Sequence, residues 1–192
     1  QELIVANKID TNDVNAVNEI YDNVHWTTTE NKNEFDQFIL RIKKIEWDNK
    51  NISTIPLTIG FLDSLNWLEL ENNLIDSLPG AIGGLDKLEY LQLYNNKLSY
   101  LPKEIGYLSN LREMHIHKNL IDTLTFSFEE LDSLRSFWVQ KNSLTSLPES
   151  LCDLIDSGSL PSRDVQYEFN SICIPDDACN LLSFEKQQQY CE

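Results

Sequence analysis

Two histidines separated by a single residue come closest, in residue type and spacing, to a site that could do chemistry. On a β-strand, His115 and His117 would lie on the same face, about 6–7 Å apart. Imidazole and carboxylate groups bind divalent metals, and Glu69, Glu71 or Glu113 would be the carboxylates near them. Because surface imidazoles are much commoner than metal sites, we expect no metal ion. We expect a weakly pH-dependent surface instead, since imidazole titrates at about pH 6–7.

Large aromatic rings alternate with apolar residues in three further stretches of the chain. Strands that bury their leucines would leave these rings on the solvent side. Bare rings are costly, and Trp and Tyr are common at the centres of binding interfaces. We therefore expect contact with a partner, although aromatic pairs that only stabilise the sheet are the alternative. The four rings are those of Trp67, Tyr90, Tyr94 and Trp138.

Acidic side chains are expected to share the face of the sheet that carries the aromatic rings. They predict a basic partner, or calcium bound at low affinity, with an association that weakens as the salt concentration rises. A solvated face without a binding role is the alternative. The four carboxylates are those of Glu46, Asp48, Glu69 and Glu71.

The charge of the whole chain narrows the classes of partner. Among 192 residues, 31 Asp and Glu stand against 15 Lys and Arg, which gives a net charge of −16 at pH 7. A field of this sign repels phosphate backbones and anionic membrane surfaces, so we expect no nucleic-acid partner. No stretch approaches the run of about 18 apolar residues that a membrane-spanning helix needs, so we expect no membrane insertion.

The sequence motifs of common enzymes are missing. There is no Gly-rich phosphate loop, no G-x-S-x-G and no H-E-x-x-H, and the chain has only six glycines. No pattern places a pair of carboxylates in a cleft, and a shallow sheet excludes water poorly. We therefore expect that the protein is not an enzyme and uses no cofactor.

A repeat of 23 residues must position all of these side chains. Leu65, Leu88, Leu111 and Leu134 are each separated by this offset, and Ile42 begins the same series one step earlier. The five aligned segments share the pattern L-x-x-L-x-L-x-x-N-x-L-x-x-L-P-x-x-I/L-x-x-L-x-x. This pattern resembles the leucine-rich-repeat family, in its 23-residue type with the L-P-x-x-I/L ending.

The resemblance implies a short α/β solenoid with a curved parallel sheet on its concave side and turns and short helical segments on its convex side. It also implies a non-enzymatic module that binds a protein on the concave face, for recognition, adhesion or inhibition. A glycan that stacks on the Trp and Tyr row is the alternative ligand.

Each repeat is expected to contribute one strand whose fourth and sixth residues point inward. The ninth position carries an asparagine whose amide can satisfy buried backbone groups of stacked coils, so we expect a structural ladder of Asn73, Asn96, Asn119 and Asn142. The third, fifth and seventh residues then point outward. From these positions we expect the partner-binding residues to be Trp67, Glu69, Glu71, Tyr90, Gln92, Tyr94, Glu113, His115, His117, Trp138 and Gln140.

Both ends of a solenoid need caps. We expect an N-terminal cap at 1–41, with a short helix behind Asn12 and Asp13 that ends near Tyr21. The five repeats occupy 42–156, and a degenerate sixth repeat with a C-terminal cap occupies 157–192.

All four cysteines lie near the C-terminus, which favours two disulfides and an oxidising compartment over free thiols or a zinc site. The repeat register predicts Cys152–Cys179 and leaves Cys173–Cys191 for the tail. The chain begins Gln-Glu-Leu without a basic and apolar leader, so we expect a secreted or cell-surface protein whose signal peptide is already removed, or a trimmed piece of one.

Overall fold

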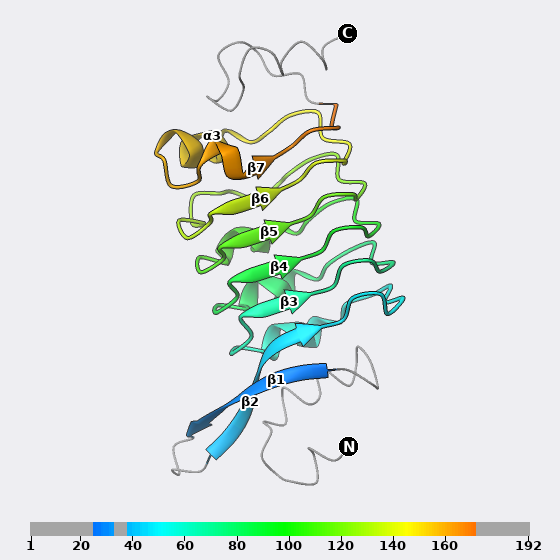
Figure 1. The fold of residues 1–192 in the computed structure, drawn as a ribbon, viewed down its shortest axis with the longest axis vertical. Helices are drawn as coiled ribbons and strands as arrows, with labels where there is room; N and C mark the ends of the chain where they lie inside the picture. Colours follow the sequence, from blue (N-terminus) through cyan, green and yellow to red (C-terminus); the bar gives the residue numbers. More distant parts are fainter. Residues whose placement is uncertain (1–24, 33–37, 172–192) are drawn as a thin grey trace.

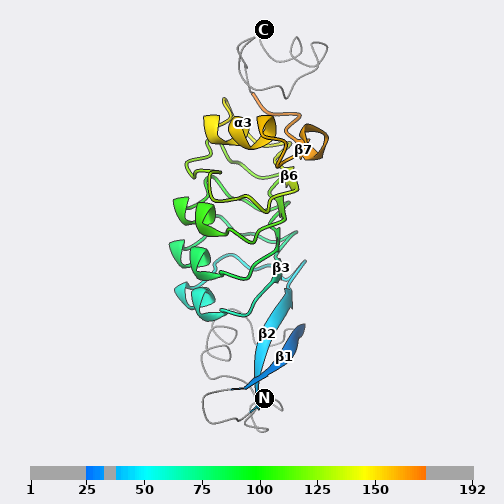
Figure 2. The same ribbon diagram turned by 90° about the vertical axis from the view of Figure 1, so that its left-hand side faces the viewer.

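The structure is a computed structural model, which describes residues 25–32 and 38–171, with side chains from residue 42 onward. The chain winds into a solenoid with strands on one side and helical segments on the other (Figures 1 and 2). The strands are β1 (His25–Lys32), β2 (Phe38–Glu46), β3 (Trp67–Glu69), β4 (Tyr90–Gln92), β5 (Glu113–His115), β6 (Ser136–Trp138) and β7 (Val165–Gln166). The helices are the 3₁₀ segments η1 (Leu57–Phe61), η2 (Gly80–Gly84), η3 (Lys103–Tyr107) and η4 (Ser162–Asp164) and the α-helix α3 (Glu149–Asp156).

The strands form a single sheet in chain order. From β2 to β7 neighbouring strands are parallel, and residues 23 apart pair with each other in the first repeats, as Trp67 does with Tyr90. The expected register of the repeats is therefore confirmed. Because every coil has the same length there, equivalent side chains are aligned from one strand to the next.

Alternation within each strand separates the core from the surface. Leu68, Leu91 and Met114 lie at the centres of their strands and are fully buried, whereas the residues on either side of Leu68 and Leu91 are partly exposed. Leu70 and Leu93 are fully buried as well. The apolar residues of the strands and return arms form one continuous core. Burial of this surface drives folding, and it fixes which side chains face outward.

The asparagine ladder is present and binds each coil to the one before it. Asn96 Nδ2 donates to the Leu93 carbonyl of its own coil at 3.0 Å and to the Leu70 carbonyl of the preceding coil at 2.9 Å. Its Oδ1 accepts from the Ile75 N–H of the preceding coil at 3.0 Å. Asn73, Asn119 and Asn142 repeat this arrangement.

The ladder explains the one repeat that lacks the asparagine. Lys50 occupies the ninth position of the first repeat, yet its backbone N–H is satisfied by Asn73 Oδ1 of the second repeat at 2.9 Å. Each asparagine thus serves the coil that precedes it. At the other end, Asn170 continues the series by donating to the Val139 carbonyl and accepting from the Leu144 N–H.

The turn after each strand needs a left-handed residue at the eighth position. Its φ is between 55° and 58° in five coils, at Asn49, Asn72, Asn95, Lys118 and Lys141. Asparagine tolerates this region better than other residues with a side chain. The turn directs the chain off the sheet at the same point in every coil.

The return arms differ between repeats, as the sequence predicts. A proline caps each of η1, η2 and η3, whereas the fourth repeat has Thr125 in place of proline and forms no 3₁₀ helix. Gly83 allows η2 and η3 to stack closely, because a Cβ there would come within 2.7 Å of Glu104.

Most residues of the two expected caps lie outside the described part of the chain. The strand β1 pairs antiparallel with β2 and covers the first coil, and β2 begins at Phe38, before the expected repeat boundary at residue 42. The expected helix behind Asn12 and Asp13 lies outside the described residues. None of the described helices is long and apolar enough to cross a bilayer.

Of the four cysteines, only Cys152 on α3 is described, and it is disulfide-bonded. Cys173, Cys179 and Cys191 lie outside the described residues, so the pairing stays a prediction.

Replacement of Asn96 by alanine is expected to lower the free energy of unfolding by about 2–4 kcal/mol, because it leaves buried backbone groups of two coils unpaired. Chemical denaturation measures this loss. The exposed neighbour Lys97 is the matched control, and Lys97→Ala should change stability by less than about 0.5 kcal/mol. A similar small change for Asn96→Ala would show that the ladder contributes little.

Candidate functional site

The outward side chains of successive coils form three rows, which together we call the sheet face. Each row is named after the position that its residues occupy in the repeat: third, fifth or seventh. The third row contains Lys44, Trp67, Tyr90, Glu113 and Ser136. The fifth row contains Glu46, Glu69, Gln92, His115, Trp138 and Gln166. The seventh row, just beyond the strands, contains Asp48, Glu71, Tyr94, His117 and Gln140. All eleven residues predicted to bind a partner therefore lie on one face.

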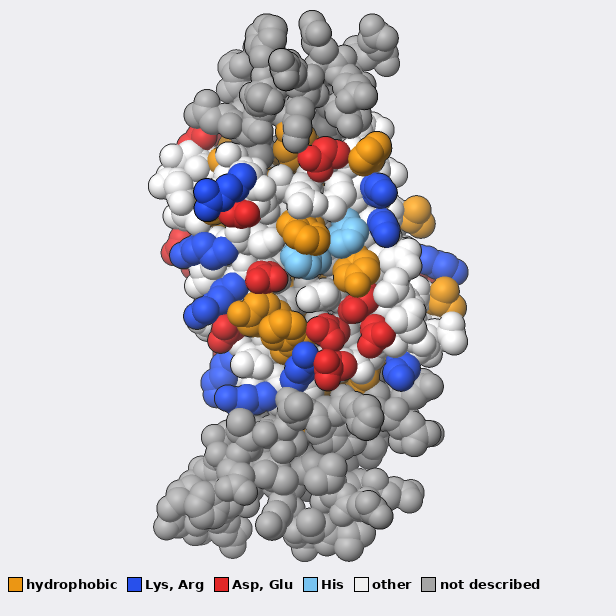
Figure 3. All heavy atoms as spheres, in the orientation of Figure 1, with side chains coloured by type: hydrophobic (Ala, Val, Ile, Leu, Met, Phe, Trp, Pro, Cys, Tyr) orange, Lys and Arg blue, Asp and Glu red, His pale blue; other side chains and the backbone are white. Residues whose placement is uncertain are grey.

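Aromatic and imidazole rings of neighbouring coils stack along these rows. Trp67 and Tyr90 have ring centroids 4.1 Å apart, and so do His115 and Trp138. Tyr94 and His117 stack at 4.6 Å with nearly parallel planes. In Figure 3 the histidines gather beside hydrophobic side chains at the middle of the face. Such pairs hold the rings in fixed orientations before any partner arrives.

Stacking also buries these side chains more than the alternation alone predicts. Trp67, Tyr90, Tyr94 and Trp138 are partly buried rather than fully exposed. His115 is a clear exception to the expected outward exposure, because only 9% of its surface is accessible. Rings in adjacent coils cover one another, since the strand spacing of about 4.8 Å is close to the 4.1 Å and 4.6 Å that separate the centroids of the stacked rings.

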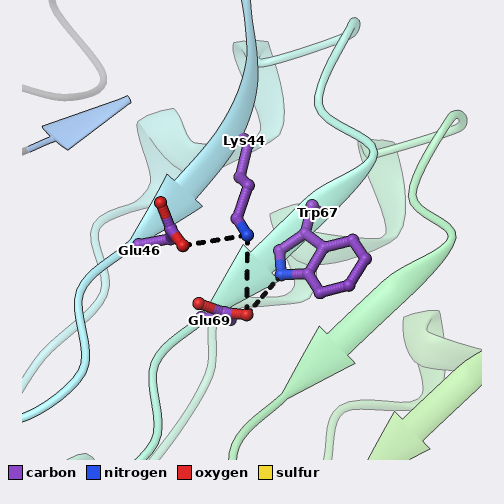
Figure 4. Close-up of polar contacts among 4 residues, drawn as sticks. All are labelled: Lys44, Glu46, Trp67 and Glu69. Atoms are coloured by element: carbon purple, nitrogen blue, oxygen red, sulfur yellow. Dashed lines mark hydrogen bonds and ion pairs between the residues drawn. The ribbon is translucent and has the colours of Figure 1, made fainter. Parts of the chain in front are cut away.

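A polar cluster occupies the end of the sheet face near β2 (Figure 4). Lys44 Nζ lies 2.9 Å from Glu46 and 3.7 Å from Glu69, and it stands over the indole of Trp67 at 4.4 Å. The Trp67 Nε1–H donates to Glu69 Oε1 at 2.6 Å. Lys44 occupies the third position of the first repeat, one of the positions that the repeat predicts to face outward.

The two histidines are neutral at physiological pH. Burial is the main cause that lowers the pKa of His115 from 6.5 to about 4, with a contribution from His117. Burial also lowers the pKa of His117 to about 4, assisted by the charges of Lys118 and Lys141. Glu113 lies 3.9 Å from His115 Nε2 and would favour the charged ring, but this carboxylate is 41% exposed and the contact is long. Desolvation therefore dominates.

These pKa values correct the prediction of a surface that responds to pH near 6–7. The prediction assumed exposed imidazoles, whereas His115 is buried and His117 is partly buried. No group of three or more His, Cys, Asp or Glu side chains within the described residues could hold a metal ion.

The seventh row contains most of the buried side-chain polar atoms that lack a hydrogen-bond partner in the described part of the chain. Three of these atoms are shielded from solvent and make no hydrogen bond: Glu71 Oε2, His117 Nδ1 and Gln140 Oε1. The same holds for Trp47 Nε1 in the core. Burial is also the largest cause that raises the pKa of Glu71, and the charges of Glu69 and Asp48 raise it further. An unpaired buried acceptor costs about 1–3 kcal/mol, so these atoms are destabilising in the isolated protein.

Comparisons with known proteins agree with this architecture. The family model described as a leucine-rich repeat region matches residues 36–155. The crystal structure of the LRR ectodomain of the receptor kinase SOBIR1 from Arabidopsis thaliana is similar with a TM-score of 0.71 and 24% identity, covering 86% of this chain and 96% of that one. The BIR2 ectodomain from Arabidopsis thaliana is similar with a TM-score of 0.61 and 23% identity, covering 74% of each chain. No curated protein matches the sequence. At these identities the likeness to solved structures is one of fold.

Proton binding by the two histidines is expected to reduce stability below neutral pH. Their pKa is lower in the folded state than in the unfolded state, so their contribution is complete above about pH 6.5 and is lost as the pH falls toward about 4. The loss is on the order of 1–2 kcal/mol, discounted because His117 is partly exposed. Denaturation of the wild type and of His115→Gln/His117→Gln at several pH values measures the difference.

Titration of the two rings by NMR gives an independent check, with both transitions expected at about pH 4. Transitions near pH 6.5 would contradict the burial of these imidazoles.

Proposed function

Because this chain belongs to the leucine-rich-repeat family, we propose that it is a non-enzymatic module that binds a protein partner on its sheet face. The role of such binding is recognition, adhesion or inhibition. The observation that carries the proposal is the alignment of outward rings and charges from successive coils on one continuous face. No other set of described side chains combines large aromatic rings with this regularity.

The fixed orientation of the rings supports a binding role. An interface loses less conformational entropy when its side chains are already ordered in the free protein. The stacked pairs Trp67–Tyr90 and His115–Trp138 meet this condition. An enzymatic role is not supported, since the polar groups lie on an open sheet that excludes water poorly.

A glycan ligand is less well supported than a protein. A sugar ring needs a free aromatic face, but Trp67 is covered by Tyr90 from β4 and by the Lys44 ammonium from β2. Trp138 is the better platform, because the rings that contact it, those of His115 and His117, both belong to the preceding coil. Quenching of Trp fluorescence by sugars would favour the glycan alternative.

We place the protein outside the cell or at its surface. Two observations support this location: Cys152 is disulfide-bonded, which is typical of oxidising compartments, and two of the similar solved structures are ectodomains. In this proposal Cys152–Cys179 and Cys173–Cys191 close the C-terminal cap.

Peptide mapping under non-reducing conditions is expected to recover fragments that contain the pairs Cys152–Cys179 and Cys173–Cys191. Loss of either bond should lower the free energy of unfolding by about 2–5 kcal/mol. Four free thiols would contradict both the cap and the oxidising compartment.

The double variant Trp67→Ala/Trp138→Ala is expected to reduce binding of a partner at least tenfold, because it removes the two largest rings of the sheet face. The stacked pairs are worth about 0.5–1.5 kcal/mol each, so the variant should be somewhat less stable but still folded. Affinity capture from the native environment, followed by calorimetry with the purified partner, measures the effect.

The matched control is Phe61→Ala/Tyr107→Ala, which removes two rings from the opposite, helical side, where they are 57% and 60% exposed. A partner that binds the sheet-face variant normally but not the control would show that the proposed face is wrong.

A further inference from the structure

The unpartnered polar atoms in the seventh row of the sheet face are of one kind, hydrogen-bond acceptors. The three atoms are a carboxylate oxygen of Glu71, an amide oxygen of Gln140 and a ring nitrogen of His117. The first two only accept hydrogen bonds, because Gln140 Nε2 already donates to Gln166. A neutral imidazole also accepts at Nδ1 when its hydrogen is on Nε2. The row therefore requires hydrogen-bond donors from outside the chain.

Water does not meet this requirement in the free protein, because the neighbouring side chains shield the three atoms. The side chains themselves are partly exposed, however. Glu71 has a second oxygen, Oε1, that is not among these shielded, unpaired atoms, so a partner can pair with its carboxylate directly. A flip of the His117 ring would turn Nδ1 to the other edge while the plane stays stacked on Tyr94. Gln140 offers its acceptor to a partner only when its bond to Gln166 is exchanged.

Charge distinguishes the two ends of the row. At the end near β2, Glu71 has Asp48 and Glu69 as electrostatic neighbours, and both destabilise its charged form. Lys44 is engaged with Glu46 and Glu69. Among the described residues, no ion pair reaches Glu71 or Asp48. The other end, at His117 and Gln140, has no carboxylate in the row, and the positive charges of Lys118 and Lys141 act on His117.

The spacing of the row fits an extended peptide. Glu71 and Gln140 are three strand spacings apart, or about 14 Å at about 4.8 Å for each. An extended chain covers this distance with about four residues at roughly 3.3 Å each. Such a chain crosses the strands and places its backbone N–H groups or amide side chains over His117 and Gln140.

We propose that the seventh row binds an extended segment of the partner that carries an arginine or lysine, with this cation held between Glu71 and Asp48 beside the ring of Tyr94. The proposal rests on the sheet face being the binding face. It adds the chemistry of the partner segment and its orientation: the cation lies toward β2 and the hydrogen-bond donors lie toward β6. Arginine fits better than lysine, because its planar fork pairs with a carboxylate and stacks on a ring.

Selection of random heptapeptides displayed on phage against the whole chain tests this. We expect enrichment of sequences with one arginine or lysine near one end. Synthetic copies should bind at least tenfold more weakly to Asp48→Asn/Glu71→Gln than to the wild type, and replacement of their arginine by citrulline should cause a similar loss.

The matched control is Glu46→Gln/Glu113→Gln, which makes the same change in net charge on the same face but outside the seventh row. Its affinity should stay within about threefold of the wild type. Equal losses of affinity for the two charge variants would show that the peptides bind through general electrostatic attraction to an acidic surface. This result would overturn the proposal. A selection without enrichment of basic sequences would overturn it as well.

Failure of this inference is distinguishable from failure of the proposed function. Selected peptides that lose binding to Trp67→Ala/Trp138→Ala but keep it to Asp48→Asn/Glu71→Gln would retain the sheet face as the binding face and reject the seventh-row site. Peptides that bind both variants as tightly as the wild type would reject both.

Discussion

The structure depends on the satisfaction of buried backbone groups where each coil leaves the sheet. Apolar burial drives the coils together, but it does not fix their register, since leucine packs on leucine in many ways. The amide of Asn96 does fix it, because its three main bonds join two coils at one height. The equal length of the first repeats, the alignment of the strands and the regular sheet face all follow from this requirement.

Alignment has a direct effect on the chemistry of the surface. Because equivalent positions lie next to each other, each outward side chain takes its environment from the neighbouring coils rather than from its own strand. Trp67 is covered by Lys44 on one side and Tyr90 on the other. His115 stacks on Trp138, and its burial, with a smaller contribution from His117, lowers the pKa of the imidazole.

The direction in which each side chain points could therefore be predicted from the sequence, whereas its burial and its contacts could not. The repeat identified the inward leucines, the asparagine ladder and the rows of outward residues, because each depends on position within one repeat. The burial of His115 and the unpaired oxygen of Glu71 depend on the rotamers of residues 23 positions away. Strand β1 was not predicted, because its antiparallel pairing with β2 leaves no periodic signal in the sequence.

The asparagine ladder makes the two ends of the solenoid different, although its coils are nearly identical. Asn73 completes the coil before it, and so does each asparagine up to Asn170. During synthesis, a coil that has emerged from the ribosome still has open backbone groups until the next 23 residues follow it. The coil at the growing C-terminal end therefore always has unpaired backbone groups. A last segment that needs no following coil must pair with them. The two ends of the protein are therefore not interchangeable, and loss of the last coil harms its neighbour more than loss of the first.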